Sequence, residues 1–294
     1  MPPLLEAMRP HQWVKNLLVF APLVFAKRMF DAEAAWHAGL AFVAFCCVAS
    51  GIYLLNDLLD LERDLAHPEK RLRPLPSGRM SKQAAIPAML ILITIGVGLA
   101  FSGERWFHLP LVLYLVINVC YSFWLKHLVI VDTMCIAVGF LLRVYTGGVA
   151  IDVEVSGWLT LCTFFVALLL AFCKRRHELS LLGEGSIVHR KSLEEYSLPF
   201  LDQLIAPLGA LTVMTYAMYT VSDQTVSFFK TRNLVYTVPF VVYGIFRYLY
   251  LVHIRTAGGN PTKLLLKDRP MLINILLWFG VSVLVIYSAA GSAS

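Results

Sequence analysis

The sequence predicts an all-α integral membrane protein that crosses the bilayer nine times. Of its 294 residues, 58% are hydrophobic and only 15% are charged, whereas soluble domains usually carry about a quarter charged residues. The apolar residues also gather in runs of about 18 residues or more, the length that a helix needs to span a bilayer. Both observations indicate a membrane protein rather than a soluble one.

Nine apolar runs are candidate spans. In chain order they are residues 13–30, 36–55, 84–101, 107–124, 130–149, 156–173, 199–221, 234–252 and 271–290. The first is the weakest candidate, because its apolar part LLVFAPLVFA is short and contains Pro22. No repeat, low-complexity stretch or long linker divides the chain, so we expect one membrane-embedded domain over residues 1–294.

The distribution of lysine and arginine predicts the orientation. If the N-terminus is cytoplasmic, 18 of the 25 Lys and Arg residues fall on the cytoplasmic side and 5 on the other, with Arg143 and Arg247 inside spans. Cytoplasmic loops are enriched in these residues, so we expect the N-terminus inside and the C-terminus outside. The long polar loops 56–83 and 174–198 are then both cytoplasmic, and any chemistry should take place on that face.

The net charge of +6 is explained by this topology. The basic residues lie in short loops between apolar runs and form no stripe interleaved with exposed aromatic residues, so we expect no nucleic-acid partner. The six cysteines lack metal-ligand spacing and fit small buried side chains.

The stretch YLLNDLLDLERD places charge at the end of the second apolar run. If that span continues as a helix, at 100° per residue, four oxygen-bearing side chains fall within an arc of about 100°. They are Asn56, Asp57, Asp60 and Asp64. Carboxylates so close repel one another, and Arg63 lies on a different face, so a divalent cation is the natural compensation. Mg²⁺ is usually held by one or two carboxylates together with phosphate oxygens. The alternative is a helix end whose charges face water.

The motif NDLLDLERD resembles the first aspartate-rich motif of the UbiA superfamily of intramembrane prenyltransferases. The resemblance extends over nearly the whole chain, and the family's nine transmembrane helices agree with the nine predicted spans. It implies a UbiA-like bundle with a polar cavity facing the cytoplasm, in which this motif binds Mg²⁺ and the diphosphate of a substrate.

The loop after the sixth span departs from the pattern of prenyl-transferring members. Those carry a second aspartate-rich motif there, whereas this loop reads CKRRHELSLLGEGSIVHRKSLEEY and is basic. A basic cluster binds phosphate directly, so we expect a donor with a phosphate besides its diphosphate, as in 5-phosphoribosyl diphosphate. Five further stretches, RPHQWVKN, DLAHPEKRLRP, YSFWLKH, GFLLR and DRP, together resemble the decaprenyl-phosphate phosphoribosyltransferase branch.

This resemblance implies Mg²⁺-dependent transfer of a 5-phosphoribosyl group to a polyprenyl phosphate in a bacterial plasma membrane. The product would be a precursor of arabinose-containing cell-envelope glycans. The expected catalytic residues are Asp57, Asp60, Asp64, Lys126 and Arg143. The expected donor-binding and phosphate-binding residues are Lys15, Asn16, Asn56, Arg71, Arg73, Tyr121, Asp132, Lys174, Arg175, Glu178 and Lys191.

Other interpretations stay open for several of these residues. Arg143 could face the polar cavity or serve a structural partner, while Lys126 could act in the site or snorkel toward the headgroups. Arg71 and Arg73 could close over phosphates or face anionic lipid. Arg247 has no obvious partner in the sequence.

Two other functions are compatible with the sequence. The first is prenyl transfer from an isoprenyl diphosphate to an aromatic acceptor, which the basic second loop argues against. The second is a metal-gated transporter, but the charges gather at one face and no inverted repeat is evident. A homo-oligomer is compatible with either.

Overall fold

The computed structural model describes residues 2–66, 69–102, 107–180, 193, 195–255, 264 and 267–291. These residues divide into two compact units, one formed by the described residues up to Val155 and the other by those from Ser156 onward. Every regular element in the described part of the chain is helical, which confirms the all-α class. The single domain over residues 1–294 stays a prediction.

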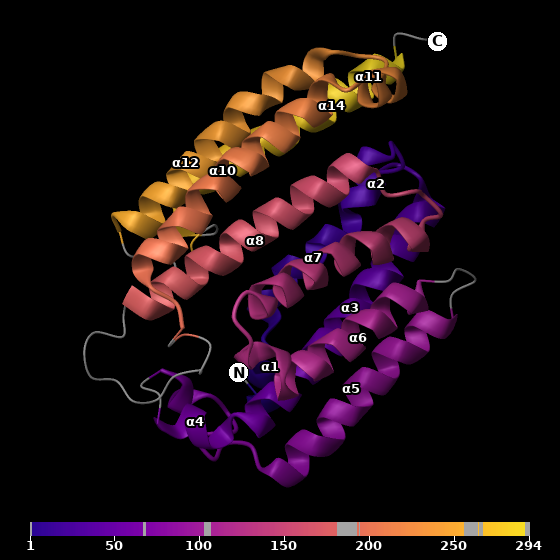
Figure 1. Cartoon of the computed structure of the whole chain (residues 1–294). Helices are drawn as coiled ribbons and strands as arrows, with labels where there is room; N and C mark the ends of the chain where they lie inside the picture. Colours follow the sequence, from indigo (N-terminus) through magenta and orange to yellow (C-terminus); the bar gives the residue numbers. More distant parts are fainter. Residues whose placement is uncertain are drawn as a thin grey trace. The chain divides into compact units, whose positions relative to one another are not determined.

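The first unit is organised around one long helix. Its elements, with η marking 3₁₀ helices, are α1 (Pro3–Ala7), η1 (Pro10–Phe20), α2 (Ala21–Phe25), α3 (Ala32–Leu59), α4 (Leu61–Ala66), η2 (Lys70–Leu72), α5 (Lys82–Ser102), α6 (His108–Phe123), η3 (Leu125–His127) and α7 (Val131–Ala150). Helix α3 packs most extensively against α5 and also contacts α6, α7 and η1 (Figure 1). Helix α3 is therefore the element around which this unit packs.

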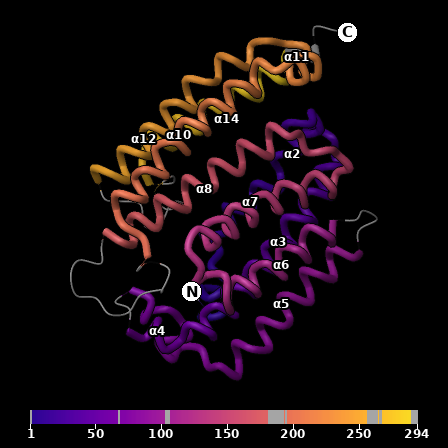
Figure 2. The backbone as a smooth tube through the Cα atoms, viewed as in Figure 1, coloured from indigo at the N-terminus to yellow at the C-terminus, as the bar shows by residue number. Residues whose placement is uncertain are grey.

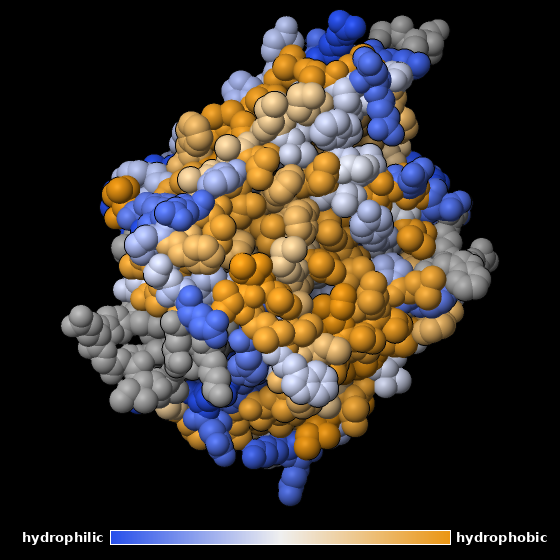
Figure 3. All heavy atoms as spheres, viewed as in Figure 1, coloured by the Kyte–Doolittle hydropathy of each residue, from blue (hydrophilic) through white to orange (hydrophobic). Residues whose placement is uncertain are grey.

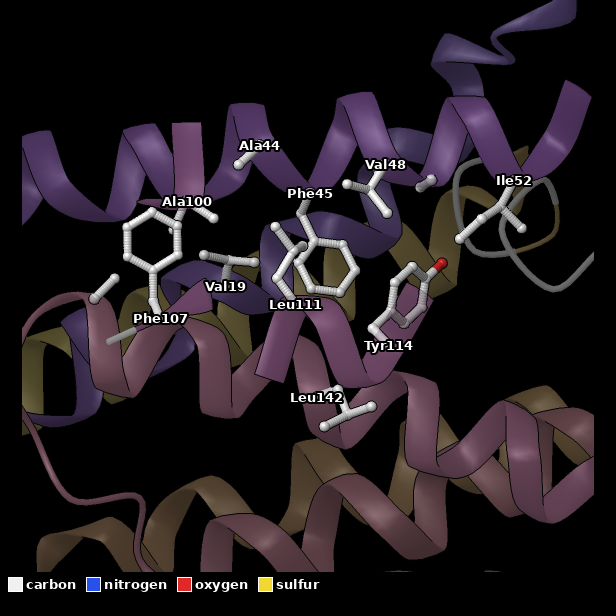
Figure 4. Close-up of a cluster of buried hydrophobic side chains, with 13 residues drawn as sticks. Val19, Ala44, Phe45, Val48, Ile52, Ala100, Phe107, Leu111, Tyr114 and Leu142 are labelled. Atoms are coloured by element: carbon white, nitrogen blue, oxygen red, sulfur yellow. The ribbon is translucent and has the colours of Figure 1, made fainter. Parts of the chain in front are cut away.

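Helix α3 begins with a side-chain cap and runs through the core of its unit. The carboxylate of Asp31 accepts a hydrogen bond from the backbone N–H of Ala34, which satisfies one of the free donors of the first turn. Farther along, the rings of Phe45 and Tyr114 lie 4.5 Å apart at their centroids, inside a cluster drawn from α3, η1, α5, α6 and α7 (Figure 4). This packing fixes the direction in which α3 delivers its last turn.

A glycine allows η1 to pass against α7. A Cβ atom added at Gly147 would lie 1.9 Å from the backbone oxygen of Val19, a distance that no side chain tolerates. Only glycine permits this close approach of backbones, and the approach presses η1 into the core.

The second unit contains α8 (Gly157–Ser180), α10 (Leu198–Val221), α11 (Asp223–Phe229), η4 (Asn233–Thr237), α12 (Val238–His253) and α14 (Arg269–Gly291). Helix α10 packs against α8 and α12, and α12 packs against α14 (Figure 2). Arg247, for which the sequence offers no obvious partner, pairs with Asp268 at 2.9 Å just before α14 begins. The hydrogen bond from Arg247 lowers the pKa of the Asp268 carboxyl.

Seven helices in the described residues are long and apolar enough to cross a membrane: α3, α5, α7, α8, α10, the η4–α12 segment and α14. Helix α5 is strongly apolar, yet only 17% of its apolar stretch is buried within the protein. Apolar side chains also predominate on the surface visible in Figure 3. An apolar helix that faces outward indicates a lipid environment.

Two of the nine predicted spans fall outside these seven. The span predicted at 107–124 is α6, which has 16 residues. The span predicted at 13–30 is no continuous α-helix, because the chain forms an 11-residue 3₁₀ helix followed by the five residues of α2. A 3₁₀ helix rises about 2.0 Å per residue, so η1 and α2 together reach about 30 Å. The count of nine stays a prediction.

Candidate functional site

The acidic motif lies where α3 ends and α4 begins. Helix α3 stops at Leu59, and Asp60 has the non-helical torsion angles φ −98° and ψ 12°. The helical hydrogen-bond pattern nevertheless continues, because Asp60 N donates to Asn56 O at 2.9 Å and Asp64 N donates to Asp60 O at 2.8 Å. The chain therefore keeps roughly helical phase across the break.

This phase brings Asp57 and Asp64 together, as the seven-residue spacing predicts. Both residues are only 2% exposed. One nitrogen of Arg73, Nη1, lies 3.1 Å from Oδ1 of Asp57 and 2.7 Å from Oδ2 of Asp64. Lys70 Nζ adds a weaker contact to Asp64 at 3.8 Å. Two buried carboxylates thus share one cationic nitrogen.

Arg9 is the second cation on Asp57, and the sequence reasoning missed it as a site residue. Its guanidinium forms an ion pair with the Asp57 carboxylate and lies 5.1 Å from the centre of the Tyr53 ring. Arg9 has a left-handed backbone (φ 55°) just before Pro10 and the start of η1. The stretch RPHQWVKN carried the only signal for this residue, because the two partners are 48 positions apart in the chain.

Asn56 and Asp60 face a different set of partners. Oγ of Ser122 lies 2.7 Å from Oδ1 of Asn56, and Lys126 Nζ donates to Asp60 Oδ1 at 2.7 Å. The Lys126 side chain is only 5% exposed, which argues against snorkelling, since that would leave the ammonium in water. Asp60 and Lys126 also line a pocket of about 400 Å³, together with Arg63 and Lys82.

A strained turn holds Lys126 beside the start of α7. Ile130 has φ 66° and ψ −46°, and Val131 N donates to Val129 O at 2.7 Å across it. This three-residue turn is rare and strained, especially for a β-branched residue. It redirects the chain from η3 into α7 and fixes the position of η3.

The donor chemistry of the motif fits Mg²⁺. Every candidate ligand is a hard oxygen from a carboxylate or an amide. One nitrogen of Arg73 already contacts an oxygen of each of the two buried carboxylates, at 3.1 and 2.7 Å. The two carboxylates therefore converge on one cationic group, as a divalent cation site requires. Within the described residues, no group of three His, Cys, Asp or Glu side chains is placed to hold a metal. Metal binding stays a prediction.

Arg143 and Asn16 form a separate, closed centre. Arg143 donates to Asn16 Oδ1 at 2.9 Å, to Gly139 O at 2.7 Å and to the Tyr114 hydroxyl at 3.0 Å. Arg143 is 5% exposed, and its guanidinium lies 5.0 Å from the centre of the Phe45 ring. The structure thus brings Arg143 to neutral partners in the core rather than to a carboxylate of the acidic motif.

The other predicted residues of this unit vary in exposure. Lys15 in η1 and Tyr121 in α6 are half-buried, and Arg71 in η2 is exposed. Asp132, in the first turn of α7, is fully buried. Their assignment to donor or phosphate binding stays a prediction.

The basic stretch of the second unit is a helix where the sequence predicts a loop. Helix α8 continues to Ser180, because a helix need not end where its apolar run ends at residue 173. Arg175 is 1% exposed and pairs with Glu178 at 2.5 Å, and Lys174 Nζ lies 3.7 Å from the same carboxylate. These contacts join residues three and four positions apart, the spacing of neighbours on a helix surface. Lys191 lies outside the described residues.

Comparison with known proteins identifies the family. A model of the UbiA prenyltransferase family matches residues 17–178, more than half of the chain. The chain belongs to the UbiA prenyltransferase family. A decaprenyl-phosphate phosphoribosyltransferase from Mycolicibacterium smegmatis is 33% identical over 293 residues, which cover 97% of this chain and 92% of the relative. A protein of the same name from Corynebacterium glutamicum is 34% identical over 97% of this chain and 86% of its own.

A solved structure shares the fold of this UbiA protein. It is a UbiA homolog from Archaeoglobus fulgidus bound to GPP and Mg²⁺, with a TM-score of 0.73 at 20% identity. The match covers 96% of this chain and 99% of the homolog. Together with the apolar helices, family membership shows a multi-pass membrane protein.

Proposed function

We propose that this UbiA protein transfers a 5-phosphoribosyl group from 5-phosphoribosyl diphosphate to a polyprenyl phosphate of the decaprenyl type and releases diphosphate. The observation that carries the proposal is the similarity over 97% of the chain to proteins named decaprenyl-phosphate phosphoribosyltransferase. The acidic motif with its surrounding cations supports it, because both substrates and the released diphosphate are anions.

The acidic motif would hold Mg²⁺ through Asp57 and Asp64, with Asn56 and Asp60 as further oxygen ligands. When bound, Mg²⁺ would neutralise the charge of the leaving diphosphate. Lys126, held by Asp60 beside the pocket, would contribute a point charge toward phosphate oxygens. Arg73 would contribute a guanidinium suited to paired contacts with phosphate.

The transfer requires positioning and charge stabilisation more than acid–base chemistry. An oxygen of the polyprenyl phosphate would attack the anomeric carbon of the ribose. The bond from that carbon to the diphosphate would break, and the diphosphate would leave with the bonding electrons. The attacking oxygen is already anionic, so no strong base is needed. The remaining phosphate of the sugar would bind the basic stretch, where Lys174 is the more exposed cation and Arg175 is buried.

The proposed location is a bacterial plasma membrane, with the N-terminus and the acidic motif on the cytoplasmic side. This orientation rests on the lysine and arginine distribution and lets the water-soluble donor reach the site. The product would serve as a precursor of arabinose-containing cell-envelope glycans.

Prenyl transfer to an aromatic acceptor is the second candidate. The family match and the homolog bound to GPP favour it. Against it stands the end of α8, which carries Lys174, Arg175 and Arg176 where prenyl-transferring members of the resembled family carry acids.

Two parallel assays, one with each pair of substrates, separate the two candidates. The purified chain in nanodiscs receives labelled 5-phosphoribosyl diphosphate, Mg²⁺ and decaprenyl phosphate, and lipid-soluble label is measured after extraction. We expect labelled lipid that depends on Mg²⁺ and on the acceptor. Absence of that product, together with turnover of a prenyl diphosphate and an aromatic acid, would overturn the proposal.

A further inference from the structure

Arg73 occupies the position from which a divalent cation could bridge Asp57 and Asp64. The same nitrogen contacts one oxygen of each carboxylate, at 3.1 and 2.7 Å. We infer that Arg73 and the divalent cation exclude each other at these carboxylates, and that Arg73 transfers to the donor's diphosphate when the cation binds. The inference rests on the metal site of the proposed function and adds a role that couples metal binding to donor binding.

The exposure of the three groups shows which one is free to move. Asp57 and Asp64 are 2% exposed, whereas the Arg73 side chain is 31% exposed. The carboxylates are carried by α3 and α4, while Arg73 follows the short η2 and has an extended backbone, φ −63° and ψ 156°. A guanidinium at the end of a long, flexible and half-exposed side chain can change partners with little disturbance of packing.

Arg9, the other guanidinium on Asp57, is held in place. Its guanidinium lies over the Tyr53 ring. Its backbone has a left-handed conformation between the end of α1 and Pro10. Its side chain is 20% exposed, less than that of Arg73. Departure of Arg73 would therefore leave Asp57 with one cation, and Asp64 with Lys70 at 3.8 Å.

The backbone beside Arg73 is anchored, so the exchange requires movement of the side chain alone. Arg79 donates to the carbonyl of Leu72 at 2.6 Å and forms a paired contact with Glu6 at 2.7 and 2.9 Å. These bonds tie the residue before Arg73 to α1 whichever partner the guanidinium has.

Charge balance gives the exchange its direction. A metal ion alone must displace a cation from two carboxylates that are already neutralised, which weakens its binding. A diphosphate anion offers the displaced guanidinium a new paired contact, so metal and diphosphate should each strengthen the binding of the other. Such coupling is reciprocal. Without Arg73, the metal should bind more tightly alone and gain less from diphosphate.

The test measures Mn²⁺ affinity on the full chain in nanodiscs by electron paramagnetic resonance, with and without inorganic diphosphate. The variant is Arg73→Gln, and the matched control is Lys70→Gln, which removes the same charge beside Asp64 without vacating the bridging position. We expect Arg73→Gln to tighten Mn²⁺ binding at least about tenfold without diphosphate, and Lys70→Gln to tighten it about threefold or less, because exposed charges are screened. In the unaltered chain, inorganic diphosphate should raise the affinity for Mn²⁺. The factor by which it does so should be about tenfold smaller in Arg73→Gln and unchanged in Lys70→Gln.

The outcomes separate this inference from the proposed function. Equal effects of the two variants would show general charge removal and overturn the inference. An unchanged response to diphosphate in Arg73→Gln would also overturn it, with the metal site intact. Failure of the unaltered chain to bind Mn²⁺ even with diphosphate would overturn the metal site and the inference together. Unfolding temperatures close to that of the unaltered chain establish that each variant is folded.

Discussion

Two of the places where the first unit buries charge are built in opposite ways. At the acidic motif the carboxylates of Asp57 and Asp64 are buried, while their shared cation, Arg73, is half-exposed. At the second place the cation of Arg143 is buried, and its partners, including Asn16 and Tyr114, are neutral. Fixed acids with a movable cation suit the binding and release of charged ligands. A buried cation whose hydrogen bonds are met by neutral groups in a packed core suits architecture.

The largest expected effect tests the acidic side of this comparison. Asp57→Asn keeps the shape of the side chain but removes the charge, and we expect turnover to fall about a thousandfold, the scale of losing a key electrostatic contact. Folding should persist, because Arg73 still has Asp64 as a partner. Turnover in the labelled-lipid assay and the unfolding temperature are measured together. A loss of activity that merely follows the yield of folded protein would make Asp57 structural.

The next effect tests the architectural side. Arg143→Leu leaves Asn16 and Tyr114 without their buried donor, and we expect a loss of about 3 kcal/mol in the free energy of unfolding. The measurement is the unfolding temperature in detergent, with Arg143→Lys as the variant that keeps the charge. If Arg143→Leu instead unfolds like the unaltered chain and loses turnover selectively, Arg143 belongs to the reacting site and the contrast between the two places disappears.

A glycine offers a test that touches no charged group. Gly147→Ala places a methyl group against the backbone of Val19 and should push η1 away from α7, at about 1–3 kcal/mol for overpacking. Since η1 carries Asn16, the hydrogen bond to Arg143 should weaken as well. The matched control is Gly98→Ala, where the added methyl group meets open space. Equal unfolding temperatures for the two variants would show that η1 does not press on α7.

Much of the acidic site follows from local sequence, because its geometry is mostly local. The seven-residue spacing of Asp57 and Asp64 predicts a shared side of the helix, and the structure confirms it. From the sequence, a divalent cation is the natural compensation for these acids, because Arg63 lies on a different face. The ion pair of Arg9 with Asp57 has no such local signal, because it depends on how α1 and η1 fold back along α3.

The remaining differences also have physical causes. Hydrophobicity marks which residues avoid water, but it does not separate a 3₁₀ helix from an α-helix, so it gives no sign that the weakest predicted span, at 13–30, is mostly a 3₁₀ helix. Charge ends the apolar run at residue 173, yet α8 continues to Ser180 because lysine, arginine and glutamate are good helix formers. Lys174 and Arg175 therefore belong to a helix and not to a loop.

The smallest expected effect concerns the anchor behind Arg73. The hydrogen bond from Arg79 lowers the pKa of the Glu6 carboxyl below its ordinary value of 4.5. A lowered carboxyl pKa adds to the free energy of unfolding at pH values above the ordinary pKa. This contribution is lost as the pH falls through the lowered pKa of the folded protein. At pH 7, Glu6→Gln should therefore unfold at a slightly lower temperature than the unaltered chain. This difference in unfolding temperature should disappear below pH 4.5. The effect should be small because both partners are solvent-exposed.

The control for this prediction is Glu154→Gln, at another exposed glutamate of the same unit. It separates loss of the Glu6–Arg79 pair from a general change in net charge, which would shift both variants alike. If Glu6→Gln still unfolds at a lower temperature than the unaltered chain at low pH, the contribution of Glu6 does not depend on its charge. If the difference in unfolding temperature disappears at low pH as expected, while Mn²⁺ binding is unchanged at pH 7, the Glu6–Arg79 pair contributes to stability alone. The exchange at Asp57 and Asp64 then depends on the Arg73 side chain by itself.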